Sequence, residues 1–314
     1  ESRRTARSAT CRKQPQRARH FPTAACHRAA AATDMVTAFT RPLLATEHGE
    51  FDTGAETLAF ALAQHCRLPL AGVLPVVSNP EFEMVAPQLA QKADAEAASK
   101  RQHLTALAQA QGVTLELQVR HGPEAWQEIV DEARARGADL IVIRRRGRRG
   151  LLANLLVGEM VSKVVAHAPC SLLVAARDAR MWTRGVLVGV DPLAPDAGTL
   201  SRAALLARDC SLPLHLVCVT AGDAGRDAAV KALAAGIAMA RTLHERVDGE
   251  ILSGRPHQVL IDAAQARGAD LLVVGRHGGA PLARAWIGGT AQKVIGLATC
   301  PVLVHVPNTQ PATP

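Results

Sequence analysis

One α/β pattern occurs twice along the chain, and this repeat constrains the fold more than any other feature. Residues 66–70 read CRLPL and residues 210–214 read CSLPL, an offset of 144 residues. The tetrapeptide GADL occurs at 137–140 and again at 268–271, an offset of 131 residues, so the first copy is 13 residues longer between its second and fourth strands. Self-similarity at such a spacing indicates two copies of one structural unit.

Each copy alternates short apolar runs with segments of helical spacing, which predicts βαβ units and a parallel sheet. We therefore expect an α/β, Rossmann-like fold with two tandem five-stranded parallel sheets and helices on both faces. Strands are predicted at 42–46, 70–77, 114–119, 140–143, 172–175, 185–190, 214–219, 250–252, 270–275 and 302–306. Helices are predicted at 54–65, 93–111, 124–136, 159–167, 197–209, 228–245, 257–266 and 290–297. The predicted domains are 35–177 and 185–307, with a linker at 178–184 and disordered segments at 1–34 and 308–314.

The basic net charge is concentrated at the start of the chain. The formal net charge is +8, but residues 1–34 carry seven Arg and one Lys against Glu1 and Asp34, which leaves +2 for residues 35–314. The excess therefore does not indicate a basic, nucleic-acid-binding face on a folded domain. We interpret residues 1–34 as an over-extended reading of the gene, with Met35 as the natural start. The alternatives are an organellar transit peptide and a nucleic-acid-binding arm, in which Phe21 is the only aromatic side chain.

Composition favours a protein in a reducing, aqueous compartment. No apolar run approaches the ~20 residues of a membrane-spanning helix. The chain has seven Cys, but none forms a C-x-x-C pair, and its 12 His form no H-x-x-x-H pair. We therefore predict a soluble cytoplasmic protein with free thiols, no metal site and no membrane partner.

The best candidate for a ligand site follows the fourth strand of the second copy. Gly275, Gly278, Gly288 and Gly289 lie between that strand and the next helix. Ligands of open parallel sheets bind beyond the carboxyl ends of the strands, where glycines and a helix N-terminus favour phosphate. Asp191, at the end of the first strand, suits a ribose hydroxyl or an adenine amine. The alternative is that these glycines only form turns.

The spacing Gly275-x2-Gly278-x9-Gly288 resembles the signature of the universal stress protein family, G-x2-G-x9-G followed by Ser or Thr, and the segment TCPVLV at 299–304 is also similar. The resemblance spans residues 41–307 and implies a tandem universal stress protein with an adenine nucleotide α hydrolase-like fold. It also implies binding of ATP or AMP, with or without Mg²⁺, and pairing of the two domains through their last strands. By this resemblance the site comprises Asp191 and Val219 at the adenine, Gly275, His277 and Gly278 along the ribose and phosphates, and Gly288, Gly289 and Thr290 at the phosphates.

Both copies depart from the family pattern. In the second copy, Gly289 stands where the family has Ser or Thr, which removes one hydroxyl contact worth ~1 kcal/mol unless Thr290 replaces it. In the first copy, Arg144 replaces the first glycine, the spacing from Gly147 to Gly158 is one residue too long, Glu159 stands at the phosphate position, and Glu47 replaces the aspartate. The arginine-rich run 144–149 could be a phosphate clamp, but we interpret it as a solvated loop whose arginines pair with Glu159 and nearby acids. The first copy is then a partner domain that binds no nucleotide.

The resemblance, with these departures, implies a regulatory stress-response protein that binds ATP or AMP in its second copy and at most hydrolyses ATP weakly. Pairing of strands 172–175 and 302–306 within one chain would mimic a dimer, and two chains could also form a homodimer. One alternative is an ATP-hydrolysing enzyme of the same fold, although the Walker pattern G-x4-G-K-[ST] is absent. The other is a nucleotide-free interaction module in which both sites are degenerate.

Overall fold

The computed structural model describes residues 37–48, 54–145, 158–222, 225–276 and 287–307. The chain divides into two units, Glu1–Met35 and Val36–Pro314, and all described residues belong to the second unit. The segments 1–34 and 308–314, predicted to be disordered, lie outside the described residues. Among the helices of the described ranges, none has both the length and the apolar character needed to cross a membrane.

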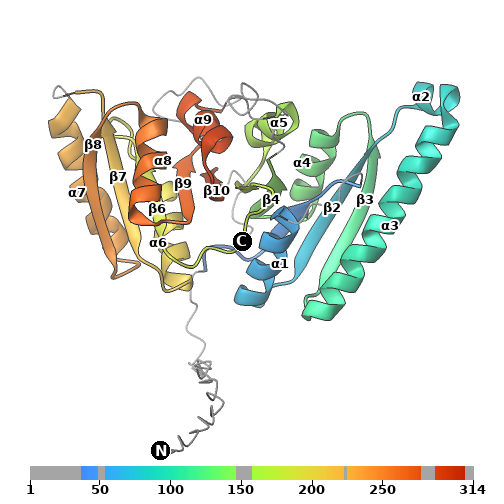
Figure 1. Ribbon diagram of the computed structural model, residues 1–314, viewed down its shortest axis with the longest axis horizontal. Coiled ribbons are helices and arrows are strands. Elements are labelled where there is room, and N and C mark those ends of the chain that lie inside the picture. Colours follow the sequence, from blue (N-terminus) through green and yellow to red (C-terminus); the bar gives the residue numbers. More distant parts are fainter. Residues whose placement is uncertain (1–36, 49–53, 146–157, 223–224, 277–286, 308–314) are drawn as a thin grey trace, which may run out of the picture. The chain divides into compact units, whose positions relative to one another are not determined.

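The described elements follow the alternating order expected from the sequence (Figure 1). The strands are β1 (Pro42–Ala45), β2 (Leu70–Val77), β3 (Leu115–Gly122), β4 (Leu140–Arg144), β5 (Ser171–Ala175), β6 (Val186–Val190), β7 (Leu214–Thr220), β8 (Val247–Ser253), β9 (Leu271–Gly275) and β10 (Val302–His305). The helices are α1 (Gly54–Cys66), α2 (Pro80–Val85), α3 (Pro87–Gln111), α4 (Ala125–Ala135), α5 (Glu159–His167), α6 (Ala197–Asp209), α7 (Arg226–Arg241), α8 (Pro256–Arg267) and α9 (Gly289–Leu297). Below, β1–β5 with their helices are the first repeat and β6–β10 with theirs are the second repeat.

The ten strands form one sheet in the order β3-β2-β1-β4-β5-β10-β9-β6-β7-β8. Neighbouring strands within each repeat are parallel, whereas β5 and β10 pair antiparallel, with Val302 opposite Val174 and Val304 opposite Leu172. The predicted fold class, α/β with parallel strands in each repeat and helices on both faces, is confirmed. The two expected five-stranded sheets are joined edge to edge into a single mixed sheet.

Each face of the sheet carries its own hydrophobic core. One core packs α1, α3, α6 and α7 against the sheet, and the other packs α4, α5, α8 and α9 against the opposite face. Successive side chains of a strand point to opposite faces, so Leu140 and Val142 enter the first core while Ile141 and Ile143 enter the second. This double burial explains why the central strands are continuously apolar in sequence.

The first repeat contains helical structure that the sequence analysis missed. The predicted helix 93–111 begins earlier, at Pro87, and the additional helix α2 precedes it from Pro80. Both helices begin at a proline, which is compatible with a helix start because the first helical N–H groups need no intrahelical acceptor. The sequence analysis assigned no helix or strand to residues 78–92, which contain both prolines. Much of the additional length of the first repeat lies in α2 and the first turns of α3.

The helix predicted at 228–245 ends earlier than expected, at Arg241. Thr242 Oγ1 donates a hydrogen bond to the carbonyl oxygen of Met239 at 2.7 Å, and the ring Nε2 of His244 lies 2.7 Å from the carbonyl oxygen of Leu212. The Thr242 hydroxyl thus bonds back to the last turn of α7, while His244 contacts the segment before β7, and the chain leaves the helix at this point.

The repeated GADL motif has the same structural role in both repeats. Gly137 and Gly268 adopt positive φ angles of 56° and 65° after their helices, a conformation that glycine allows at no steric cost. The aspartate then accepts hydrogen bonds from the backbone that enters the first strand of its repeat. Asp139 accepts from the N–H groups of Thr40 and Arg41 at 2.6 and 2.9 Å. Asp270 accepts from Thr183, Arg184 and Gly185 at 2.8, 3.0 and 3.1 Å.

Candidate functional site

A cavity of about 770 Å³ opens at the carboxyl ends of β6, β7 and β9 in the second repeat. This is the edge of an open parallel sheet where ligands bind. The cavity brings together six of the eight residues predicted for the site. These are Asp191, Val219, Gly275, Gly288, Gly289 and Thr290. The other two, His277 and Gly278, lie outside the described residues.

Asp191 is held at the end of β6 by its own loop. Its Oδ1 accepts hydrogen bonds from the N–H groups of Leu193 at 2.9 Å and Ala194 at 3.4 Å. Within the described ranges Oδ2 accepts no hydrogen bond, so this oxygen can accept one from a ligand. Burial, together with the nearby Asp191 carboxylate, raises the pKa of the Cys218 thiol to about 11. Cys218 is therefore a neutral, buried neighbour and not a reactive group in the cavity.

The walls of the cavity are mostly apolar. Val219 is 8% exposed, Val274 is 4% exposed and Leu260 is 4% exposed, and all three line the cavity. Branched aliphatic side chains of this kind suit the faces of a planar purine. An apolar wall beside one carboxylate is thus chemically compatible with an adenine base.

Two further glycines shape the cavity, and the sequence analysis did not identify them. Gly254 has a φ of +141°, and a Cβ atom there would lie 2.9 Å from Cγ2 of Val259. A Cβ atom at Gly189 would lie 3.0 Å from Cδ1 of Leu260. Gly189 interrupts an otherwise apolar strand, a pattern that marks close approach of a neighbour or ligand and could have revealed it.

The N-terminus of α9 faces the cavity without a side-chain cap. The N-cap residue is Gly288, whose N–H donates to the carbonyl oxygen of Arg276 at 2.9 Å. The N–H groups of Gly289, Thr290 and Ala291 have no acceptor among the described residues. Free N–H groups and the helix dipole favour an anion here. A Cβ atom at Gly289 would have no heavy atom within 4 Å, so this position has space for a larger residue.

At the equivalent place in the first repeat, the described residues enclose a much smaller cavity. This cavity measures about 20 Å³ and is lined by Ala45, Arg144 and Met160 among others. Arg144 takes the place of Gly275, and Met160 takes the place of Thr290. The larger side chains thus occupy space that is open in the second repeat.

The arginine-rich run of the first repeat is only partly described, because residues 146–149 lie outside the described residues. The expectation that its arginines pair with acids is wrong for Arg145, whose Nη1 donates to carbonyl oxygens of α9. Glu159 pairs instead with Lys163 one helical turn away, at 3.0 Å between Oε1 and Nζ. Lys163 is the better placed partner because residues four apart share one face of a helix.

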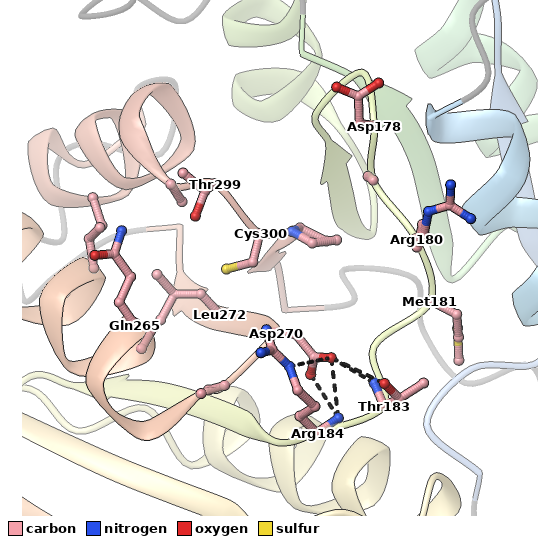
Figure 2. Close-up of a pocket in the computed structure, with 17 residues that line it drawn as sticks. Asp178, Arg180, Met181, Thr183, Arg184, Gln265, Asp270, Leu272, Thr299 and Cys300 are labelled. Atoms are coloured by element: carbon pink, nitrogen blue, oxygen red, sulfur yellow. Dashed lines mark hydrogen bonds and ion pairs between the residues drawn. The ribbon is translucent and has the colours of Figure 1, made fainter. Parts of the chain in front are cut away.

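A second cavity, of about 510 Å³, lies around the linker at the amino ends of β9 and β10 (Figure 2). Its main charged group is Asp270, whose carboxylate already accepts the backbone hydrogen bonds that start β6. Figure 2 shows Arg184 and Thr183 turned toward this carboxylate, with Cys300 nearby on the segment that leads into β10. Burial raises the pKa of the Cys300 thiol, which keeps it protonated. Asp270 and Arg184 pair with each other and with the backbone that starts β6, so we favour the larger cavity as the candidate site.

Thiols and metals add no further site. Within the described ranges, the thiols of Cys66, Cys170, Cys210, Cys218 and Cys300 are free. Among the described residues, no three His, Cys, Asp or Glu side chains gather in a way that could hold a metal ion.

A doubly wound α/β domain with a cleft at the carboxyl ends of its strands defines a broad class of ligand-binding proteins. The pattern of the Universal stress protein family matches residues 40–176 and 183–307. The chain therefore belongs to the universal stress protein family and contains two tandem domains of it.

Individual relatives agree with this assignment. A universal stress protein of Thermus aquaticus is 40% identical over 67 residues, covering 21% of this chain and 49% of the relative. Universal stress protein Slr1230 of Synechocystis is 25% identical over 166 residues, covering 52% of this chain and 57% of the relative. The chain thus spans about half the length of these relatives. The crystal structure of a putative universal stress protein from Pseudomonas aeruginosa has a TM-score of 0.62 at 22% identity, covering 86% of this chain and 94% of that one, which supports the fold.

Proposed function

We propose that the second repeat binds ATP or AMP in its large cavity and that the protein acts as a nucleotide-dependent regulator in a stress response. The contrast between the two clefts carries this proposal: about 770 Å³ in the second repeat against about 20 Å³ in the first. Pockets for small ligands commonly measure ~300–1,000 Å³. The family resemblance supplies the chemical class of the ligand.

The described residues fit an adenine nucleotide. The apolar wall of Val219, Leu260 and Val274 suits the base, and Asp191 Oδ2 can accept a hydrogen bond from an amine or a ribose hydroxyl. The free N–H groups of α9 can donate to phosphate oxygens. We infer that the first repeat binds no nucleotide and that the domains extend over 35–177 and 185–307. Pairing of β5 with β10 would then let one chain take the arrangement of a dimer, in the cytoplasm.

Exchange of equivalent residues between the repeats tests the proposal. Gly275→Arg places in the second repeat the residue that narrows the cleft of the first. In isothermal titration of the full chain with ATP and AMP, it should weaken binding by about 100-fold or more, because the side chain takes ligand volume. The matched control, Arg144→Gly, should leave the measured affinity within about twofold, since it alters only the first cleft.

The other two candidate functions give different results in the same samples. If the unsubstituted chain steadily releases inorganic phosphate from ATP, and Gly275→Arg abolishes this release, the protein is an ATP-hydrolysing enzyme. Absence of any heat of binding for ATP and AMP with the unsubstituted chain would leave a nucleotide-free interaction module and overturn the proposal.

A further inference from the structure

Two arginines cross the boundary between the repeats in opposite directions. Arg276, the residue after β9, directs its Nη1 to the carbonyl oxygens of Val165 and Ala166 in α5 of the first repeat, at 3.5 and 3.3 Å. Its counterpart Arg145, the residue after β4, reaches into the second repeat. Arg145 Nη1 lies 2.5, 2.8 and 3.1 Å from the carbonyl oxygens of Ile295, Gly296 and Ala298, at the end of α9.

The chemistry of both contacts is that of a helix C-terminus. The last carbonyl groups of a helix have no intrahelical donor and carry the negative end of the helix dipole, so a guanidinium group is a suitable partner. Both arginines are about half-buried, and burial lowers the pKa of each side chain. They remain cationic because the guanidinium group of arginine keeps its proton in proteins.

Only Arg276 is also built into the wall of the large cavity. Its N–H donates to the carbonyl oxygen of His305 in β10 at 3.0 Å, and its own carbonyl oxygen accepts the N–H of Gly288 at 2.9 Å. Gly288 is the N-cap residue of α9. One residue therefore connects the last strand, the start of the helix that faces the cavity, and α5 of the other repeat.

We propose that Arg276 is a positioning residue for the nucleotide site of the second repeat, and that the first repeat contributes to nucleotide affinity through α5. The proposal rests on the proposed function. Gly275, Gly288 and Gly289 have no side chains with which to fix their backbone, and ordering such residues costs more conformational entropy than ordering other residues. The contacts of the Arg276 side chain with α5 restrict the backbone next to Gly275, and the carbonyl group of Arg276 in turn holds Gly288. The first repeat thereby keeps a role in binding although its own cavity is much smaller.

Arg276 also lines the cavity, so a direct contact with phosphate is the competing explanation. The two explanations differ in their dependence on ligand charge. A lost ion pair between the guanidinium group and phosphate weakens ATP, which carries more negative charge, more than AMP. A misplaced Gly288 instead disturbs backbone donors to a phosphate that both nucleotides carry, and so weakens both alike. The two explanations also differ in the salt dependence of nucleotide affinity. Affinity becomes less dependent on salt when a cation that contacts the ligand is removed, but not when only the backbone of Gly288 moves.

The experiment compares Arg276→Met with Arg145→Met in the full chain. Titration with ATP and with AMP, each at two salt concentrations, should show a loss of about tenfold for both nucleotides in Arg276→Met, the size of one or two net hydrogen bonds. Arg145→Met should change affinity by less than about threefold. Arg145 makes three contacts between the repeats and Arg276 makes two. If nucleotide affinity depended only on how strongly the two repeats are held together, Arg145→Met would lower it more than Arg276→Met.

Three results would overturn the proposal. They are an unchanged affinity in Arg276→Met, equal losses in the two methionine variants, and a loss for ATP that exceeds the loss for AMP tenfold. If Arg276→Met does not fold, Arg276→Lys replaces it. Lysine keeps the charge but not the reach of the guanidinium group, so a loss smaller than in Arg276→Met and still equal for both nucleotides is expected.

Hydrogen exchange of the nucleotide-free protein separates this proposal from the proposed function. Arg276→Met should speed exchange of the Gly288 amide, which donates to Arg276, and Arg145→Met should not. If the unsubstituted chain binds neither ATP nor AMP, the proposed function fails. The exchange rates then still show whether Arg276 positions Gly288, and unchanged rates would refute that role independently.

Discussion

Lys100 Nζ lies 2.5 Å from Oε1 of Glu56, and both side chains are buried between α1, α3 and the sheet. Thr46 Oγ1 donates to the same carboxylate oxygen at 2.6 Å. In the second repeat the equivalent places belong to Ala232 and Leu200, which are also buried. A charged cluster in one repeat thus replaces apolar packing in the other.

The ion pair predicts a strong departure from additivity. Glu56→Leu or Lys100→Ala alone should lower the free energy of unfolding by about 3–5 kcal/mol, because each removes one partner of a buried ion pair. The double variant carries the residues of the second repeat at both positions. Its loss in free energy of unfolding should be clearly smaller than the sum of the losses in the two single variants. Urea denaturation measures all three values, and additive costs would show that the charges do not stabilise one another.

The open space at Gly289 predicts that its missing hydroxyl can be restored. Gly289→Ser should tighten ATP binding about fivefold, since one net hydrogen bond contributes ~1 kcal/mol. The control is Gly289→Ala, which adds the Cβ atom and helix propensity without the hydroxyl. Titration of both variants is decisive, and a serine variant that binds no more tightly than the alanine variant would refute the hydroxyl contact.

His305, at the junction of the repeats, predicts a loss of stability in mild acid. Burial lowers its pKa to about 4, with Arg202 acting in the same direction and Asp196 opposing it, and its Nδ1 lies 3.2 Å from Ser171 Oγ. The unfolded chain binds this proton near pH ~6.5, whereas the folded chain does so only near 4. The stabilisation is therefore complete above pH ~6.5, falls as the pH drops toward 4, and changes no further below that value.

Urea denaturation between pH 7.5 and 4.5 checks this window. His305→Asn keeps a polar atom near Ser171 but does not titrate, so its free energy of unfolding should depend less steeply on pH. An identical slope in the variant would assign the acid sensitivity to other groups.

The two GADL aspartates predict matched losses of stability without loss of nucleotide binding. Asp270→Ala leaves three backbone N–H groups without their acceptor and should lower the free energy of unfolding by about 2–4 kcal/mol. Asp139→Ala in the first repeat should cost a similar amount. Both aspartates lie at the amino ends of the strands, away from the large cavity. The affinity for ATP should therefore change less than about twofold when it is measured under conditions in which the variants are fully folded. A large loss of affinity in Asp270→Ala would instead assign the linker cavity to the ligand.

The repeat and the periodicity were sufficient to predict most elements of the fold. The predicted segments 70–77, 159–167 and 197–209 coincide with β2, α5 and α6. These segments combine strong apolar patterning with clear turn residues at both ends. Helix α2 was missed because the prediction relied on an apolar stripe that packs on a core. The apolar side chains at the end of α2, Met84 and Val85, are exposed and form no such stripe.

The candidate site could be predicted where it depends on backbone chemistry near the strand ends. Six of the predicted residues meet in one cavity because parallel strands end at one edge of the sheet. Arg276 could be predicted from the sequence only as a positive charge near the phosphates. Its contacts with α5, and the packing of Leu260 against Gly189, could not be predicted, since each joins elements far apart in the sequence. Arg145 was misassigned for the same reason: its acceptors are backbone carbonyl groups about 150 residues away, which have no signature in side-chain sequence.

The antiparallel pairing of β5 with β10 has a consequence for how such a protein can change. In a dimer of identical chains, every substitution appears on both sides of the symmetry axis. Here the two sides are encoded separately, so an arginine can fill one cleft while a glycine keeps the other open. Because the two halves are covalently linked but encoded separately, their sequences can diverge, and one half can lose its cleft while the other keeps an open one.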